Sequence, residues 1–288
     1  MIDKILSFGR MIKFSHTVFA LPFALSAVIL AIHQQYTIKI WDIAWIILAM
    51  VGARSAAMGF NRVVDSHLDA KNPRTAQRAI PSGEITQLQS ILFVIFFSIL
   101  FLFSAANLAR ICFYCGIPVL LLLFIYSYSK RYTSLCHIYL GFAISMAPLG
   151  AWIAITKKFD WPILVVSLAL LTHIAGFDIL YACQDYDYDR KEGLFSIPAK
   201  YGIKAALYIS SFLHLLCFLA FVTIYYLFDM NVIYILAVVL IGIALVIEHL
   251  IVKPDNLSQV PIAFFHINST ISLVFLAGIA GDVLLCQM

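Results

Sequence analysis

The chain has 288 residues, of which 63% are hydrophobic and 12% are charged, and its formal net charge is +4. A soluble domain carries roughly 25% charged and 45–50% apolar residues, so this composition excludes an ordinary soluble protein and indicates an integral membrane protein. We expect the lipid bilayer as a partner. The small positive charge gives no reason to expect a nucleic acid as another.

A membrane-crossing helix needs about 20 mostly apolar residues, and nine segments meet this requirement. In chain order we predict spans near residues 16–33, 41–60, 87–107, 111–128, 136–156, 161–182, 204–227, 231–251 and 261–284. The first follows basic residues, as in a signal peptide, but its apolar run exceeds the roughly 7–15 residues of such a peptide and has no clear cleavage site. We expect it to be retained, in an all-α polytopic membrane protein with one domain over residues 1–288.

The distribution of Lys and Arg predicts the orientation, because short cytoplasmic loops carry an excess of both. Fourteen of the nineteen lie at the N-terminus or in the loops after the second, fourth, sixth and eighth spans, and four lie on the other side. The remaining one, Arg54, falls inside the second span. We therefore predict a cytoplasmic N-terminus.

The acidic residues are gathered in two windows of the sequence. Eight of the fifteen lie between residues 65 and 84 or between residues 178 and 192. The windows follow the second and sixth spans, so both fall on the predicted cytoplasmic side. This arrangement suggests one site assembled from two distant parts of the chain.

The first window predicts a polar stripe if the second span continues through it as a helix. At about 100° per residue, four residues share one face: Arg54, Asn61, Asp65 and Asp69. The helix must end before Pro73, because the residue preceding a proline avoids the α conformation. The loop that follows carries Arg74 and Arg78.

The second window predicts a similar face on a continued sixth span. The same helical geometry places Asp178, Asp185 and Asp189 within about 40° of one another, with Tyr181 at the edge of that face. Asp187 points to the opposite side, toward loop or solvent.

Two acidic faces with Arg and Lys nearby indicate a site for a diphosphate and Mg²⁺. Mg²⁺ prefers oxygen ligands, keeps several waters and is usually held by a few carboxylates together with substrate phosphates. Zinc is disfavoured, since no His or Cys lies at ligand spacing. His67 lies on another side of the helix, and we expect neither His67 nor Arg62 to take part.

Solvated helix ends and ion-coupled transporters can also place acids in windows of this kind. Against solvated ends, Arg54 and Asp178 lie inside apolar runs, where ionisable groups are costly and usually functional. An ion-coupled secondary transporter is a less favoured alternative, because its carboxylates would lie near the membrane midplane, whereas these acids gather at one edge.

The two windows resemble the motifs of the UbiA family of intramembrane prenyltransferases. The first motif, N-x-x-x-D-x-x-x-D, is matched by Asn61, Asp65 and Asp69, and the R-T-x-x-R-x-x-P-S-G loop by Arg74, Thr75, Arg78, Pro81, Ser82 and Gly83. The second motif, D-x-x-Y-A-x-x-D-x-x-x-D, is matched by Asp178, Tyr181, Ala182, Asp185 and Asp189. A Y-x-x-x-K-R element is matched by Tyr126, Lys130 and Arg131. Arg62 stands where many members carry an acid.

The resemblance implies a fold and an activity. The fold would be about nine transmembrane helices around a central cavity open to the cytoplasm, in a bacterial inner membrane. The activity would be Mg²⁺-dependent transfer of a polyprenyl group from polyprenyl diphosphate to an aromatic acid of the 4-hydroxybenzoate type, in ubiquinone biosynthesis. The same chemistry on a dihydroxynaphthoate, for menaquinone, is the alternative acceptor.

The resemblance also implies roles for single residues. Mg²⁺ would be held by Asn61, Asp65, Asp69, Asp178, Asp185 and Asp189. The substrates would be bound by Arg54, Arg74, Arg78, Tyr126 and Lys130. The catalytic residues would be Asp65, Lys130, Tyr181 and Asp185. Arg54 would contact an aromatic carboxylate or the diphosphate, unless it is the structural partner of an acid on its own stripe.

Overall fold

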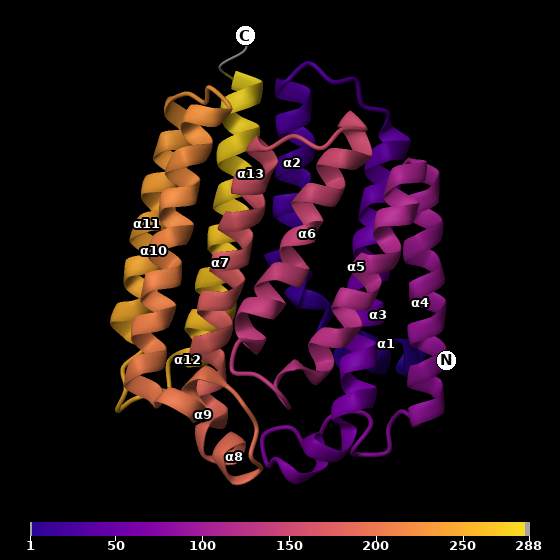
Figure 1. The fold of residues 1–288 in the computed structure, drawn as a ribbon, viewed down its shortest axis with the longest axis vertical. Coiled ribbons are helices and arrows are strands. Elements are labelled where there is room, and N and C mark those ends of the chain that lie inside the picture. Colours follow the sequence, from indigo (N-terminus) through magenta and orange to yellow (C-terminus); the bar gives the residue numbers. More distant parts are fainter. Residues whose placement is uncertain (1, 286–288) are drawn as a thin grey trace. The chain divides into compact units, whose positions relative to one another are not determined.

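The structure is a computed structural model that describes residues 2–285 (Figure 1). Within this range the regular elements are helical and no strand occurs. Nine helices of the described residues are long and apolar enough to cross a membrane. These findings confirm the predicted all-α polytopic fold, because both the helix count and the span positions agree.

Two spans are longer than predicted. The second runs over Ile40–Lys71, and the sixth, with its continuation, over Pro162–Lys191. Both extensions carry an acidic motif, so polar helical turns follow the apolar ones. A span predicted from hydropathy ends where apolar residues give way to polar ones. The polar helical turns were therefore not included in the predicted spans.

Contacts divide the chain into two compact units, each described by itself. The first comprises the described residues up to 17 together with Ile40–Tyr128, and the second comprises Val18–Lys39 and the described residues from 129 onward. The prediction of one domain over residues 1–288 stays a prediction, and residues 1 and 286–288 lie outside the described part.

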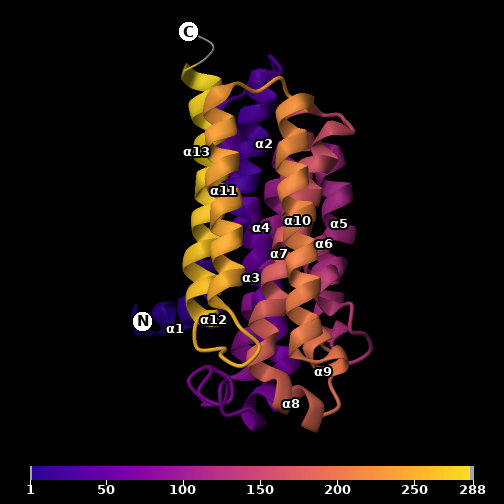
Figure 2. The same cartoon turned by 90° about the vertical axis from the view of Figure 1, so that its left-hand side faces the viewer.

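The first unit is built from α1 (Ile2–Met11), α3 (Ile40–Lys71), α4 (Gln87–Leu108) and α5 (Arg110–Ser129). In Figure 2, α1 runs across the direction of α3. Helices α3 and α4 pack closely because Gly52 has no side chain: a Cβ there would lie 2.8 Å from the backbone nitrogen of Phe101. A capping box between Thr86 and Gln89 begins α4 and fixes where the loop after α3 ends.

The second unit contains six long helices: α2 (Leu21–His33), α6 (Cys136–Thr156), α7 (Pro162–Ala182), α10 (Ile203–Leu227), α11 (Val232–Ile251) and α13 (Asn268–Leu285). Three short helices complete it: α8 (Tyr186–Lys191), α9 (Ile197–Tyr201) and α12 (Val260–Ile262). Helix α7 packs against both α6 and α10, while α11 packs against α10 and α13, as Figures 1 and 2 show. The second acidic motif therefore begins on a helix that is packed on two sides.

Candidate functional site

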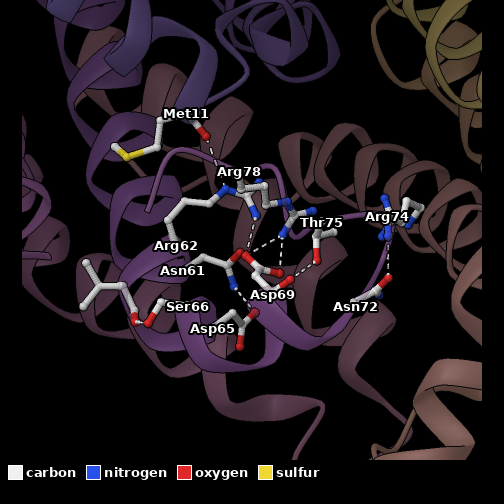
Figure 3. A network of polar contacts seen from close by, with 11 residues as sticks. Met11, Asn61, Arg62, Asp65, Ser66, Asp69, Asn72, Arg74, Thr75 and Arg78 are labelled. Carbon is white, nitrogen blue, oxygen red and sulfur yellow. Dashed lines mark hydrogen bonds and ion pairs between the residues drawn. The ribbon is translucent and has the colours of Figure 1, made fainter. Parts of the chain in front are cut away.

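The first motif lies on the last three turns of α3, which end at Lys71 as the proline rule predicts (Figure 3). Asn61, Asp65 and Asp69 follow one another at four-residue intervals on an unbroken helix. The Nδ2 of Asn61 donates to Oδ2 of Asp65 at 3.1 Å. This bond uses the amide nitrogen, so Asn61 keeps its amide oxygen as a ligand atom one turn from the Asp65 carboxylate.

Asp69 is engaged by arginines. Nη1 of Arg78 donates to both carboxylate oxygens of Asp69, at 2.7 and 2.8 Å. The Asp69 side chain is only 7% exposed and Arg78 is 23% exposed, so the ion pair is largely withdrawn from water. In this structure Asp69 holds Arg78 in place, with the Arg78 guanidinium turned toward the motif.

Arg62 is not the bystander that the sequence suggested. Its side chain is buried, its Nε donates to the carbonyl of Met11 at 3.2 Å, and its Nη1 lies 3.8 Å from Oδ2 of Asp69. Arg62 therefore ties α1 to the motif and adds a second positive charge beside Asp69. The side chain of His67 is exposed.

The loop after α3 is folded by its own polar side chains. Oδ1 of Asn72 accepts from the N–H of Arg74 at 2.9 Å, and the Thr75 hydroxyl donates to the Asp69 carbonyl at 3.0 Å. These bonds reverse the chain around Pro73 and bring Arg78 back over α3. Arg74 lies on the outer side of this turn, next to Asn72 and away from Asp69 (Figure 3).

Arg54 and Tyr126 complete the predicted residues of the first unit. Nη2 of Arg54 donates to the carbonyl of Lys13 at 3.2 Å, and its buried Nε has no hydrogen bond. Among the described residues Arg54 forms no ion pair with an acid of its own stripe. Tyr126 is half-buried near the end of α5.

The second motif is not carried on one continuous helix, so the helical-wheel argument for it is wrong. Helix α7 ends at Ala182, a 3₁₀ turn covers Cys183–Asp185, and α8 begins at Tyr186. A 3₁₀ turn has three residues per turn instead of 3.6, so the angular phase changes between Asp178 and Asp189. The prediction for Asp187 is confirmed, since this residue is exposed.

Asp178 is held by a residue that the sequence analysis did not select. Nδ1 of His137, at the start of α6, lies 2.7 Å from Oδ2 of Asp178. Nε2 of His137 accepts from the N–H of Ile197 at 3.3 Å. This arrangement fits a neutral imidazole that donates from Nδ1. Only a weak sequence pattern points to His137. It is a polar residue in the first turn of a span that begins just after the Lys130–Arg131 element.

Asp189 is surrounded by polar groups of the second unit. Its side chain is buried, it is hydrogen-bonded by the Ser196 side chain, and the charges of Asp185 and Lys130 act on it. The Lys130 carbonyl accepts from the N–H of Phe195 at 2.7 Å. The segment after α8 therefore folds back onto the Lys130 region, which brings Lys130, Asp185 and Asp189 together.

Tyr181 stands between the acids of the second motif, on the last turn of α7. Its ring centroid lies 4.2 Å from that of Phe264. Both side chains are half-buried. Tyr181 is thus packed by another aromatic ring and is not a loose boundary residue.

The donor chemistry of both motifs fits Mg²⁺. The amide and carboxylate groups of Asn61, Asp65, Asp185 and Asp189 are oxygen donors. Within either unit, the described residues contain no cluster of three or more His, Cys, Asp or Glu side chains placed to hold a metal. Mg²⁺ does not need such a cage, because it is usually bound through one or two carboxylates, waters and substrate phosphates.

Comparisons with known proteins agree with this chemistry. Residues 20–270 match the model of the UbiA prenyltransferase family. Proteins named 4-hydroxybenzoate octaprenyltransferase are similar: one from Tolumonas auensis is 32% identical over 157 residues, and one from Vibrio parahaemolyticus is 31% identical over 166. These matches cover 54% and 56% of this chain and 55% and 57% of the relatives, so the chain spans about half the length of the curated relatives it matches.

Solved structures share the fold. A UbiA homolog from Aeropyrum pernix K1, in its apo form, has a TM-score of 0.83 at 27% identity and covers 93% of this chain and 98% of its own. A UbiA homolog from Archaeoglobus fulgidus, bound to DMAPP and Mg²⁺, has a TM-score of 0.76 at 18% identity and covers 97% and 99%. The second likeness shows the fold alone. Because the family match covers most of the sequence and includes both acidic motifs, the chain belongs to the UbiA prenyltransferase family.

Proposed function

We propose that this protein transfers a polyprenyl group from its diphosphate to an aromatic acid of the 4-hydroxybenzoate type, in a Mg²⁺-dependent reaction. Family membership and the names of the similar proteins support the substrate classes. The relatives' names favour this acceptor over a dihydroxynaphthoate and imply a place in ubiquinone biosynthesis.

The observation that carries the proposal is the buried end of α3. There Asn61 and Asp65 present oxygen atoms one turn apart, beside an Asp69–Arg78 ion pair. Oxygen ligands next to fixed guanidinium groups suit a metal–diphosphate complex better than they suit a transported ion, since cations near the carboxylates would repel that ion.

We assign the Mg²⁺ ligands to Asn61, Asp65, Asp185 and Asp189. Asp69 and Asp178 act behind them, because Arg78 and His137 already engage their carboxylates. Bound Mg²⁺ would offset the negative charge that develops on the departing diphosphate.

Arginine and lysine side chains bind the diphosphate in this proposal. Arg78 is already oriented by Asp69, so it loses less side-chain freedom when substrate binds than an unrestrained arginine would. Arg74 and Lys130 provide further N–H donors, and such charge-assisted bonds to phosphate oxygens are short and strong.

The acceptor acid is bound by Arg54, whose Nε has no hydrogen bond in the protein. Tyr126 and Tyr181 orient the substrates.

The bond between the first prenyl carbon and the diphosphate oxygen breaks, and a new bond joins that carbon to the ring carbon ortho to the phenol. The ring loses a proton, and diphosphate leaves with the bonding electron pair. Apolar helix faces keep water from the allylic cation.

The protein acts in the bacterial inner membrane with its N-terminus in the cytoplasm. The excess of Lys and Arg on that side supports this orientation. Labelling of single cysteines introduced in the loop at residues 72–86 and in the loop at residues 34–39 tests it: only the first should be shielded from a membrane-impermeant reagent in intact cells.

Mass spectrometry of the products tests the proposed reaction. The purified protein is offered one polyprenyl diphosphate with 4-hydroxybenzoate or with dihydroxynaphthoate, with Mg²⁺ or with EDTA. We expect prenylated hydroxybenzoate and released diphosphate, lost in EDTA and restored by Mg²⁺. Prenylated naphthoate alone would reassign the acceptor. Uptake of a solute driven by an ion gradient, without diphosphate release, would overturn the proposal.

A further inference from the structure

A buried polar cluster of the second unit is not used by the proposed reaction. It contains Glu248 on α11, Asn268 at the start of α13 and His214 on α10, which are 0%, 0% and 2% exposed. Ionisable side chains inside membrane helices are costly and usually serve a function. The contacts of these three side chains indicate the function of the cluster.

Asn268 follows a π turn at Ala263–Ile267, where α12 passes into α13. Such turns interrupt the α-helical bonding pattern and are frequent at functional sites. Nδ2 of Asn268 donates to the carbonyls of Ala263 at 2.9 Å and Phe264 at 3.4 Å, and to Oε1 of Glu248 at 2.8 Å. One amide group therefore satisfies carbonyls of the π turn and ties the turn to α11.

Glu248 also lies close to α10. Its Oε2 has no hydrogen bond but lies 3.4 Å from Nδ1 of His214. That nitrogen is also 2.9 Å from Nε2 of His249, and Nε2 of His214 is 3.3 Å from the carbonyl of His173 on α7. The carboxylate that receives Asn268 thus lies beside α10, and His214 on α10 contacts α7.

The π turn places an aromatic ring beside the second motif. Phe264 lies within the turn, and its ring centroid is 4.2 Å from Tyr181, 5.3 Å from Phe177 and 5.5 Å from Phe19. Such ring pairs stabilise their packing beyond the burial of their area. A shift of the turn would therefore change the packing of Tyr181, which sits between Asp178 and Asp185 in sequence.

We propose that Glu248 and Asn268 are positioning residues for Tyr181: they hold the π turn, and the turn holds Phe264 against the Tyr181 ring. The consequence for catalysis rests on the proposed function, but the placement of Tyr181 does not. The cluster lies in the second unit and contains none of the residues assigned above to substrate or metal.

The second unit offers a matched control at the other end of α13. Asp282 is 1% exposed, and its carboxylate accepts from the N–H groups of Asn231 at 2.7 Å and Tyr234 at 3.0 Å. It is also a buried acid that joins α11 to α13, but fourteen residues, or about 21 Å along the helix, separate it from Asn268. If substitutions act through general stability, changes at either end of α13 should disturb Tyr181. If they act through positioning, only changes at the Asn268 end should do so.

The direct test observes Tyr181 by ¹⁹F NMR in protein labelled with 3-fluorotyrosine. The chain has 14 tyrosines, and the signal lost in Tyr181→Phe identifies residue 181. We expect Glu248→Leu, Asn268→Ala and Phe264→Leu to shift or broaden this signal. Glu248→Gln, which keeps the Oε1 acceptor, and Asp282→Leu should leave it in place. Asn268→Ala decides the matter if Glu248→Leu does not fold.

Prenyl transfer provides the second readout. We expect kcat to fall about tenfold in Glu248→Leu and Phe264→Leu with KM changed less than twofold, equivalent to about 1.4 kcal/mol in the activation barrier, and Glu248→Gln to restore it. An unmoved Tyr181 signal in folded Asn268→Ala, or equal shifts in Asp282→Leu, overturns the proposal. A wild-type protein that releases no diphosphate defeats the proposed function, while the ¹⁹F signals still decide the placement of Tyr181.

Discussion

The first acidic motif lies on one unbroken helix, whereas the second crosses an α-helix, a 3₁₀ turn and a short α-helix. In the first motif Asp69 is paired with Arg78, which is nine residues away in sequence. In the second, Asp178 is bonded to His137, which is 41 residues away. The residue that orients the first motif is therefore close to it in sequence. The residue that orients the second motif lies on a neighbouring helix.

This difference shows that acidic side chains can be oriented in two physical ways. A continuous helix fixes the direction of each side chain by its period, so local sequence suffices. Where the helix is interrupted, tertiary hydrogen bonds must fix the direction instead. Substitutions in each motif can reveal how far the two depend on these different supports.

The largest expected effect is on catalysis, and it should be equal for the two motifs. Asp65→Ala and Asp185→Ala should each lower the rate of diphosphate release by about a hundredfold or more, as loss of a group that stabilises developing charge does elsewhere. Initial rates at saturating Mg²⁺ measure this. Asp187→Ala, which changes an exposed acid of the second window, is the control and should stay within about twofold. A normal rate in Asp65→Ala alone would restrict the chemistry to the second motif.

The next effect concerns the stability that the ion pair gives to the first motif. Asp69→Ala should lower the free energy of unfolding by about 3 kcal/mol, the lower end of the range for breaking a buried pair, because Arg78 remains 23% exposed. The double variant Asp69→Ala/Arg78→Ala should lose less than the sum of the single variants, since the pair is coupled. Thermal unfolding in detergent measures both. Additive losses would show that the pair contributes nothing of its own.

Both motifs are followed by a glycine in the left-handed region, with φ of 78° at Gly83 and 69° at Gly193. An L-residue there costs about 1–2 kcal/mol, so Gly83→Ala and Gly193→Ala should destabilise by similar amounts despite the different helices before them. Gly9→Ala in α1, where an added Cβ meets nothing within 4 Å, should stabilise by up to about 1 kcal/mol. Thermal unfolding of the three variants measures these differences. Unequal losses at the two loops would indicate that one turn can rearrange.

The smallest effect is a pH dependence at the end of the first motif's loop. Hydrogen bonds from Ser7 and Arg10 hold the pKa of Glu84 below its usual value of 4.5. A lowered folded-state pKa stabilises the protein above the usual pKa, and this contribution is lost as the pH falls through the lowered value. Glu84→Gln should therefore melt slightly below the wild type at pH 7, and the difference should vanish in acid. A difference that persists below the lowered pKa would assign the effect to packing.

Much of the fold could be predicted from the sequence because membrane spans are long and uniformly apolar. The first motif could also be predicted: its four-residue spacing predicts a shared face, and Pro73 predicts that the helix ends before it, as α3 does at Lys71. In each case the determining information lies within a few helical turns, where periodicity and backbone sterics act.

The remaining features depend on contacts between distant residues. Nothing in the local sequence at Cys183–Asp185 marks a 3₁₀ turn, because the acids before and after it keep a helix-compatible spacing. Arg62 was dismissed because its role depends on the carbonyl of Met11, 51 residues away. His137 was overlooked because an isolated histidine in an apolar run gives no pattern to recognise.

Helix α3 has 32 residues and is therefore about 48 Å long at 1.5 Å per residue. The hydrocarbon core of a bilayer is about 30 Å thick. If α3 enters this core near Ile40, its last dozen residues extend beyond it, and these residues carry Asn61, Asp65 and Asp69. The motif then stands at the depth of the lipid headgroups. In the proposed reaction, a polyprenyl diphosphate would reach it by lateral diffusion with its tail still dissolved in the bilayer. The encounter would then be a search in two dimensions, at a concentration set by the membrane.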